Sequence, residues 1–140
     1  MHAQTPDAIA RTWFEEVWNQ GRVDTIHRLF AADCLAKGLP GVDTTGPAAF
    51  EVLFHRFRGA FPDIRVTVER TITEGEWVAA ICQVSGTHTG ETLGPPTGQP
   101  VNFSGVAIAR VAGGQIREAD NCFDFLTMYQ QLGIVPALGG

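Results

Sequence analysis

The sequence QIREADNCFD (residues 115–124) runs directly into FLTMYQQLG (residues 125–133), a strand pattern followed at once by a helix pattern. Asp120 and Asn121 interrupt a strand that is otherwise apolar enough to line a core. Burying such polar groups without partners costs about 1–3 kcal/mol each. We therefore expect this strand to border a cavity that carries polar groups, and we expect the chemistry of the protein to lie there.

The order of elements before this strand predicts an α+β fold, with helices first and long antiparallel strands after them. Apolar residues recur at helical spacing in three early segments, and from residue 64 onward the period falls to two. The predicted helices span residues 6–19, 23–31, 47–60 and 125–133, and the predicted strands span residues 34–39, 64–74, 77–84, 101–111 and 115–124.

Glycines inside or beside the strands predict that the sheet is strongly curved. Gly86, Gly90 and Gly105 are the relevant positions, because glycines and bulges are where strands bend. A curved antiparallel sheet packed against N-terminal helices encloses a pocket. At 140 residues the chain is expected to form one such domain, residues 1–140.

Composition and charge exclude several function classes. The formal charge is −5, and the ten Lys and Arg residues form no basic run, so nucleic acid is not an expected partner. No apolar stretch approaches the roughly 18 residues that cross a bilayer, and no secretion signal is visible at the N-terminus. We expect a cytoplasmic protein with no membrane contact, whose partner is a hydrophobic small molecule.

The cysteines and histidines do not predict a metal site or a disulfide framework. Cys34, Cys82 and Cys122 lack CxxC spacing, and the four histidines show no HxxxH or HxH pair. We expect buried, reduced thiols and no metal ion. Asp124, with Thr127 three residues later, is expected to cap the last helix.

Several short motifs, taken in their order along the chain, resemble those of the SnoaL-like polyketide cyclases, or ester cyclases, of the nuclear transport factor 2-like superfamily. The motifs are residues 24–30, residues 34–38, GTHTGE (86–91), PPTG (95–98), FSG (103–105) and QQLG (130–133). The resemblance runs from about residue 6 to residue 133. It implies a cone with one apolar pocket, a homodimer or homotetramer, and an intramolecular aldol closure that uses no metal or organic cofactor.

In the family's cyclases an acidic side chain on the last strand removes a proton next to a carbonyl, and histidines help to handle the enolate. These positions correspond here to Asn121, Ala107 and Ala119, so the chain departs from the pattern at all three. Asn121 cannot abstract a proton, although its amide can donate hydrogen bonds to a developing oxyanion.

Asp120 is therefore the candidate general base, with a pKa raised by an apolar cavity. Strand alternation places it on the face opposite Asn121 unless a bulge shifts the register. The alternative is that Asp120 is a salt-bridged or interface carboxylate.

Two further residues are catalytic candidates. Lys37 is the only lysine, and if it points inward its amine could form a Schiff base with an aldehyde or ketone. Such (retro-)aldolase chemistry would suit an engineered or repurposed scaffold; otherwise Lys37 is a surface lysine. His88 is a candidate acid or substrate anchor near the pocket mouth, or else a structural loop histidine.

The expected pocket wall combines aromatic side chains with the two vacant alanine positions. Its members are Trp13, Phe54, Phe103, Ala107, Ala119 and Phe123. Three functions remain open at this point. The chain is a lyase or isomerase of the cyclase type with Asp120 as base, a Lys37 Schiff-base enzyme, or a non-catalytic ligand-binding or assembly domain.

Overall fold

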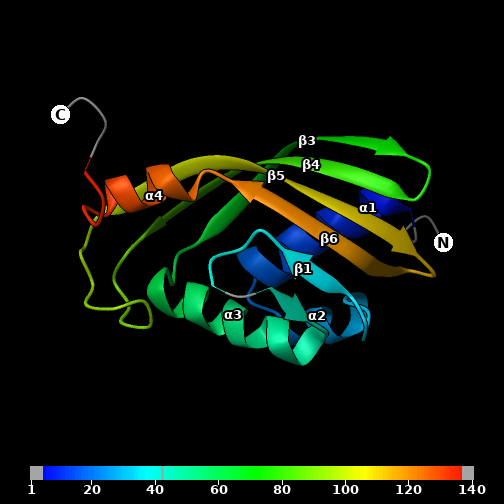
Figure 1. The fold of residues 1–140 in the computed structure, drawn as a ribbon, viewed down its shortest axis with the longest axis horizontal. Coiled ribbons are helices and arrows are strands. Elements are labelled where there is room, and N and C mark those ends of the chain that lie inside the picture. The colour runs from blue at the N-terminus through cyan, green and yellow to red at the C-terminus, as the bar shows by residue number, and fades with distance from the viewer. Residues whose placement is uncertain (1–4, 42, 137–140) are drawn as a thin grey trace.

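The computed structural model describes residues 5–41 and 43–136. Figure 1 shows one long curved sheet with α1, α2 and α3 gathered on one side of it. The elements are α1 (Pro6–Thr12), the π-helix η2 (Trp13–Asn19), α2 (Val23–Leu29), β1 (Leu35–Lys37), β2 (Thr44–Thr45), α3 (Pro47–Ala60), β3 (Arg65–Glu74), β4 (Trp77–Thr87), β5 (Pro100–Ala112), β6 (Gln115–Phe123) and α4 (Phe125–Gln131). The predicted α+β fold is confirmed.

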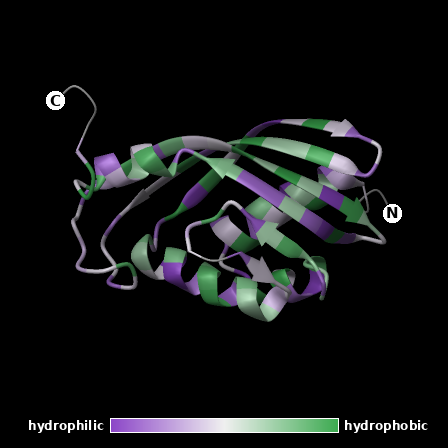
Figure 2. Ribbon diagram, viewed as in Figure 1, coloured by the Kyte–Doolittle hydropathy of each residue, from purple (hydrophilic) through white to green (hydrophobic). Residues whose placement is uncertain are grey.

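Among the described residues the sheet has six strands in the order β2-β1-β6-β5-β4-β3. Strands β3 to β6 form an antiparallel meander, whereas β1 pairs in parallel with β6 through Ala36 and Ala119. This parallel pair brings a segment from the first third of the chain beside the last strand. Figure 2 shows hydrophobic and hydrophilic residues alternating along the strands, as a sheet with one covered face requires.

Curvature comes from two register shifts and from a close approach at one glycine. The extra, unpaired residue is Glu69 on β3 at the first shift and Arg117 on β6 at the second. At Gly105 a Cβ atom would lie only 2.3 Å from the ring of Phe123, so glycine alone lets that ring lie across β5. Gly105 was among the glycines expected to shape the sheet.

The first helix differs from the prediction of one helix over residues 6–19. Thr5 caps it and Pro6 begins it as expected, but from Trp13 the backbone forms a π-helix. In an α-helix, side chains five residues apart point about 140° away from each other. The wider i→i+5 turn brings Trp13 and Trp18 to the same side, and both are buried.

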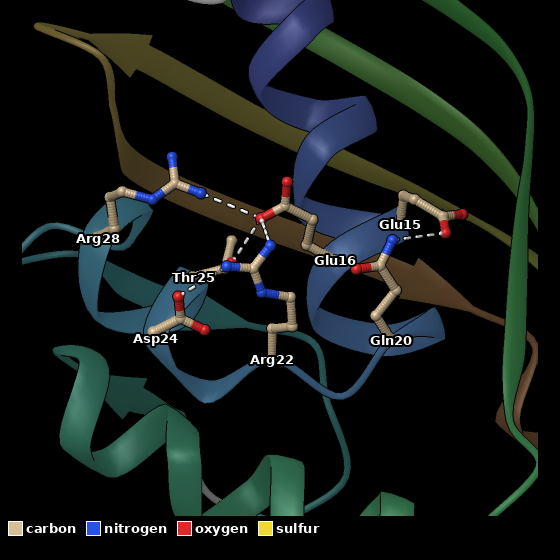
Figure 3. A network of polar contacts seen from close by, with 7 residues as sticks. All are labelled: Glu15, Glu16, Gln20, Arg22, Asp24, Thr25 and Arg28. Atoms are coloured by element: carbon tan, nitrogen blue, oxygen red, sulfur yellow. Dashed lines mark hydrogen bonds and ion pairs between the residues drawn. The ribbon is translucent and has the colours of Figure 1, made fainter.

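A carboxylate network joins the π-helix to α2. Glu16 Oε1 accepts hydrogen bonds from Thr25 Oγ1 (2.7 Å) and Arg28 Nη2 (3.1 Å), and Arg22 lies 3.4 Å away. Figure 3 shows these three side chains converging on Glu16 from α2 and the turn before it. The contacts fix η2 against α2 and hold its two tryptophans in place.

A second polar contact joins α2 to α3. The Nε2 atoms of His27 and His55 lie 2.6 and 3.0 Å from the two carboxylate oxygens of Glu51. Since a carboxylate only accepts, both imidazoles donate to it. These hydrogen bonds lower the pKa of Glu51 below its ordinary value.

Two cysteine predictions hold and one is wrong. Cys34 and Cys82 are buried and reduced, and burial raises the pKa of each thiol to about 12. Cys122 is exposed, because alternation on β6 directs it to the uncovered face of the sheet. None of the described helices is long and apolar enough to cross a bilayer.

We predict that Glu51→Gln lowers the melting temperature at neutral pH by a few degrees. A carboxyl with a lowered folded-state pKa stabilises the fold above its unfolded-state pKa, and this contribution disappears as the pH falls through the folded-state value. The difference between wild type and variant should therefore shrink from pH about 7 to pH about 3. Calorimetry of both proteins over this pH range measures the difference in melting temperature. A difference that stays constant with pH would show that the Glu51 carboxylate is not its source.

Candidate functional site

An apolar cavity lies between the concave face of the sheet and the helices. It leaves about 100 Å³ for the centres of water-sized molecules, well beyond the roughly 10–15 Å³ that one water requires. Its wall includes Ala10, Trp13, Phe14, Trp18, Phe30, Leu39, Phe50, Leu53, Phe57, Ala80, Val84, Phe103, Ala107, Ala119, Asn121, Phe123 and Phe125. The predicted internal pocket is thus present, and it is almost entirely hydrocarbon.

The helical side of the pocket is an aromatic cluster. Trp13 stacks on Phe30 with ring centroids 5.7 Å apart and meets Phe50 edge-on at 5.1 Å. Of the two aromatic residues expected in the pocket wall, Trp13 lines the cavity and Phe54 is not among the lining residues. Phe54 packs against Trp18 at 5.4 Å, behind the pocket wall, because its place on α3 is one residue away from the pocket-lining Leu53.

The sheet side of the pocket is formed by the predicted strand residues. Phe103, Ala107, Ala119 and Phe123 all line the cavity. Ala107 is the register partner of Asn121, and Ala119 precedes it by two residues on the same face. Two small side chains therefore leave free space around the Asn121 amide.

Among the described residues that line the cavity, Asn121 is the only one with a side-chain amide, and none is charged. Its Nδ2 donates a 3.0 Å hydrogen bond to the backbone carbonyl of Lys37. The adjacent Gly38 has φ +83°, and a Cβ atom there would lie 1.9 Å from the carbonyl oxygen of Asn121. The end of β1 thus packs directly on β6 and fixes the amide, leaving its second N–H and its oxygen for a ligand.

The prediction that Asp120 serves the pocket as a general base is not supported by its placement. Asp120 is exposed and is absent from the cavity wall, while its neighbour Asn121 lines it. The bulge of β6 lies at Arg117, and from Glu118 to Phe123 each residue has a register partner in turn, so alternation is undisturbed at Asp120. A base must come within hydrogen-bond reach of the proton it removes. The Asp120 carboxylate lies on the face of the sheet away from the cavity, so it does not reach a substrate bound there.

Lys37 is also outside the pocket. Its backbone pairs with Asp120 across β1 and β6, and its side chain is exposed while the preceding Ala36 lines the cavity. The condition for Schiff-base chemistry in the pocket, an inward-pointing amine, is not met. Lys37 contributes its carbonyl oxygen instead, a role that side-chain patterns could not predict.

His88 is buried but does not line the cavity either. Its Nδ1 accepts from the backbone N–H of Thr97 at 3.2 Å, and its ring packs 5.4 Å from that of Phe61. These contacts fasten the loop after β4 to the end of α3. The structural interpretation of His88 therefore fits its surroundings better than a site at the pocket mouth, and Asp124 likewise caps α4 by accepting from Thr127 N at 3.0 Å.

Comparisons with known proteins agree with this geometry. Residues 8–132 match the SnoaL-like polyketide cyclase family. The chain belongs to this family. It is 32% identical to the nogalonic acid methyl ester cyclase of Streptomyces nogalater, over 83% of this chain and 89% of that protein. It is 29% identical to the aklanonic acid methyl ester cyclase DnrD of Streptomyces peucetius, over 84% of each chain.

Solved structures share the fold. IdmH of Streptomyces antibioticus superimposes with a TM-score of 0.77 at 30% identity, over 91% of this chain and 98% of that one. A protein with a ketosteroid isomerase-like fold from Catenulispora acidiphila gives a TM-score of 0.78 at 20% identity, over 94% and 95%. The predicted nuclear transport factor 2-like cone of this SnoaL-like protein is confirmed.

We predict that an uncharged aromatic ketone such as 2-acetylnaphthalene quenches tryptophan fluorescence saturably. Trp13 and Trp18 line the pocket, whereas Trp77 lies outside it and is 37% exposed. The variant Trp77→Phe should retain the full quenching amplitude, and Trp13→Phe should lose part of it. Quenching that never saturates, or that disappears in Trp77→Phe, would contradict binding in this pocket.

Proposed function

We propose that this SnoaL-like protein is a cofactor-free cyclase that closes a ring in a hydrophobic carbonyl compound by an intramolecular aldol reaction. One observation carries the proposal: the fixed amide of Asn121 lies in a pocket whose other described lining residues are aliphatic or aromatic. Membership of a cyclase family, and relatives named as cyclases of polyketide methyl esters, support the reaction type.

The amide would act on the oxygen of the carbonyl that is enolised. In a cavity of low polarity, one hydrogen bond to a developing oxyanion is worth far more than the same bond in bulk solvent. One N–H of the Asn121 amide donates to the Lys37 carbonyl, which leaves the other N–H free and fixed in direction, so little reorganisation is needed during the reaction. Aromatic side chains on the opposite wall would hold the planar, apolar part of the substrate.

The reaction balances without an added reagent. A C–H bond between two carbonyls of the substrate breaks, and its proton passes to water, since no described lining side chain is a carboxylate, imidazole or amine. The enolate carbon then bonds to a second carbonyl carbon of the same molecule, and the new alkoxide takes a proton back from water. The product is an isomer of the substrate.

The two alternatives differ from this proposal in what they require. Schiff-base catalysis requires an amine in the pocket, and Lys37 is exposed outside it. A purely ligand-binding domain requires only the apolar wall. Both functions predict that the ligand binds, so an assay of turnover distinguishes them and a binding assay does not.

We predict that the protein converts aklanonic or nogalonic acid methyl ester to a cyclised product of unchanged mass, and that Asn121→Ala lowers kcat about 10²–10³-fold, the usual effect of removing one oxyanion donor. The matched control is Asp120→Asn, one residue away on the opposite face, which should keep wild-type kcat. Chromatography with mass spectrometry measures both. Binding without any turnover would favour the ligand-binding function, and loss of activity in Asp120→Asn would restore Asp120 as the base.

We also predict that Asn121→Asp raises kcat and adds an acidic limb to the pH–rate profile. This change places a carboxylate at the position where the family's base falls, and the apolar surroundings would raise its pKa above the ordinary value. A profile that stays flat at acidic pH, with kcat no higher than that of Asn121→Ala, would show that this position does not face the reacting carbon.

A further inference from the structure

His88 holds together the connection between β4 and β5, residues 88–99, which we call the strap. The backbone N–H of His88 donates to the carbonyl of Gln99 (3.0 Å), and the N–H of Gly98 donates to the carbonyl of His88 (2.8 Å). Inside the strap, His88 Nδ1 accepts from the backbone N–H of Thr97. The strap therefore folds around the imidazole, which is only 1% exposed.

The strap is fastened to the C-terminal end of α3. The N–H of Gly90 donates to the carbonyl of Ala60 (3.0 Å), and the hydroxyl of Thr92 donates to the carbonyl of Arg56 (2.6 Å). A Cβ atom at Gly90 would lie 1.5 Å from the carbonyl oxygen of Gly59, so the two backbones touch. A helix leaves its last carbonyls without partners of its own, and the strap therefore completes the end of α3.

This end of α3 supports the pocket wall. The ring of His88 packs on Phe61, and Phe61 stacks on Phe57 with ring centroids 6.5 Å apart. Phe57 lines the cavity. Figure 1 shows the strap and the last turns of α3 at the same end of the molecule. Release of the strap would therefore loosen Phe57 in the pocket wall.

The imidazole fits this place only without charge. Because Nδ1 accepts, the one proton of the neutral ring is on Nε2, which is buried and has no hydrogen-bond partner among the described residues. A second proton would occupy Nδ1 and point at the N–H of Thr97. If Nδ1 turned to the Thr97 hydroxyl, 3.1 Å away, that backbone N–H would lose its acceptor and Nε2–H would stay unpaired.

The charges around the strap do not compensate a protonated His88. The titratable side chains of the strap, of the last two turns of α3 and of the turn that follows are His55, Arg56, Arg58, Asp63 and Glu91. Both carboxylate oxygens of Asp63 already accept from Thr87, at 2.7 and 2.9 Å. A buried, unpaired charge is costly, whereas in a released strap both ring nitrogens donate to water.

We propose that His88 makes the strap sensitive to pH: protonation of the imidazole releases the strap from α3 and loosens the ligand-binding pocket. Release binds a proton, so the released state gains population as the pH falls. Histidine is the side chain whose charge ordinarily changes between about pH 5 and 8, which is the range to test. The proposal goes beyond the cyclase function, since it requires a bound ligand but no turnover.

Hydrogen–deuterium exchange with mass spectrometry measures the release. From about pH 7.5 to about pH 5.5, protection of the strap and of the end of α3, corrected for the intrinsic exchange rate, should fall about tenfold or more, because each pH unit changes a one-proton equilibrium by up to tenfold. His88→Asn should stay protected at both pH values, since the asparagine Oδ1 accepts from the Thr97 N–H and takes no proton. An unchanged wild-type strap, or an equal loss in His88→Asn, would overturn the proposal.

His55→Asn is the matched control. It removes a histidine from the same helix, but this imidazole contacts Glu51 at 3.0 Å and not the strap. Its strap should therefore lose protection with falling pH as the wild type does. Loss of the pH dependence in His55→Asn would assign the effect to His55 and contradict the role of His88.

Binding of 2-acetylnaphthalene, a probe that does not ionise, tests the link to the pocket. Its Kd, from tryptophan quenching, should rise about fivefold or more over the same pH range in the wild type and stay constant in His88→Asn. A strap that is released while the Kd stays constant would refute this link. Neither readout measures turnover, so their failure is distinct from failure of the cyclase function.

Nitrogen-15 NMR of the wild type keeps the proposal testable if circular dichroism shows that His88→Asn does not fold. At about pH 7.5 the spectrum should place the single ring proton of His88 on Nε2, as a neutral imidazole with an accepting Nδ1 requires. The ring should gain its second proton over the same pH range in which the strap loses protection. A ring proton on Nδ1, or protonation that leaves the strap protected, would overturn the proposal.

Discussion

The parallel pairing of β1 with β6 is the constraint on which the pocket depends. It joins a three-residue strand to the last strand of the meander through Ala36, Lys37, Ala119 and Asp120. Without it, the carbonyl of Lys37 would not reach the Asn121 amide, and Ala36 would not close the cavity wall. Gly38 makes the contact possible, because any side chain there would collide with the backbone of Asn121. A short strand with little stability of its own thus sets the one polar feature of the site.

The two-residue period of β6 divides its polar groups between the two faces of the sheet. Asn121 faces the cavity together with Ala119 and Phe123, while Asp120 and Cys122 face outward. A shift of one residue would exchange these sets and bury a carboxylate in hydrocarbon, at a cost of several kcal/mol. Burial of the apolar face therefore fixes the register, and with it the chemistry available on each side of the sheet.

Periodicity and turn residues were enough to predict the helices, the meander and the cap at Asp124, because these features depend on local sequence. The π-helix could not be predicted, since Trp13, Val17 and Trp18 fit an ordinary amphipathic helix equally well. The sequence left Lys37 and His88 open between a catalytic and a structural role, because their directions depend on tertiary contacts, the β1–β6 pairing and the packing on Phe61. Asp120 was left undecided by the sequence because a bulge changes which face a side chain occupies. The bulge of β6 falls at Arg117, and beyond it Asp120 alternates with the cavity-lining Asn121.

Because the described lining residues of the pocket offer no side-chain base, the acidity of the substrate's own C–H bond decides whether the reaction can proceed. An amide can stabilise an enolate but cannot accept its proton, so a reaction at Asn121 needs a carbon acid that ionises without a strong base. A methylene between two carbonyls meets this requirement, because the negative charge of its enolate is spread over two oxygens. The Asn121 amide then needs to donate a hydrogen bond to only one of them. A simple ketone does not. Replacing a carboxylate by an amide in an apolar cavity also removes the desolvation cost of a buried charge, which is consistent with the apolar wall that surrounds Asn121.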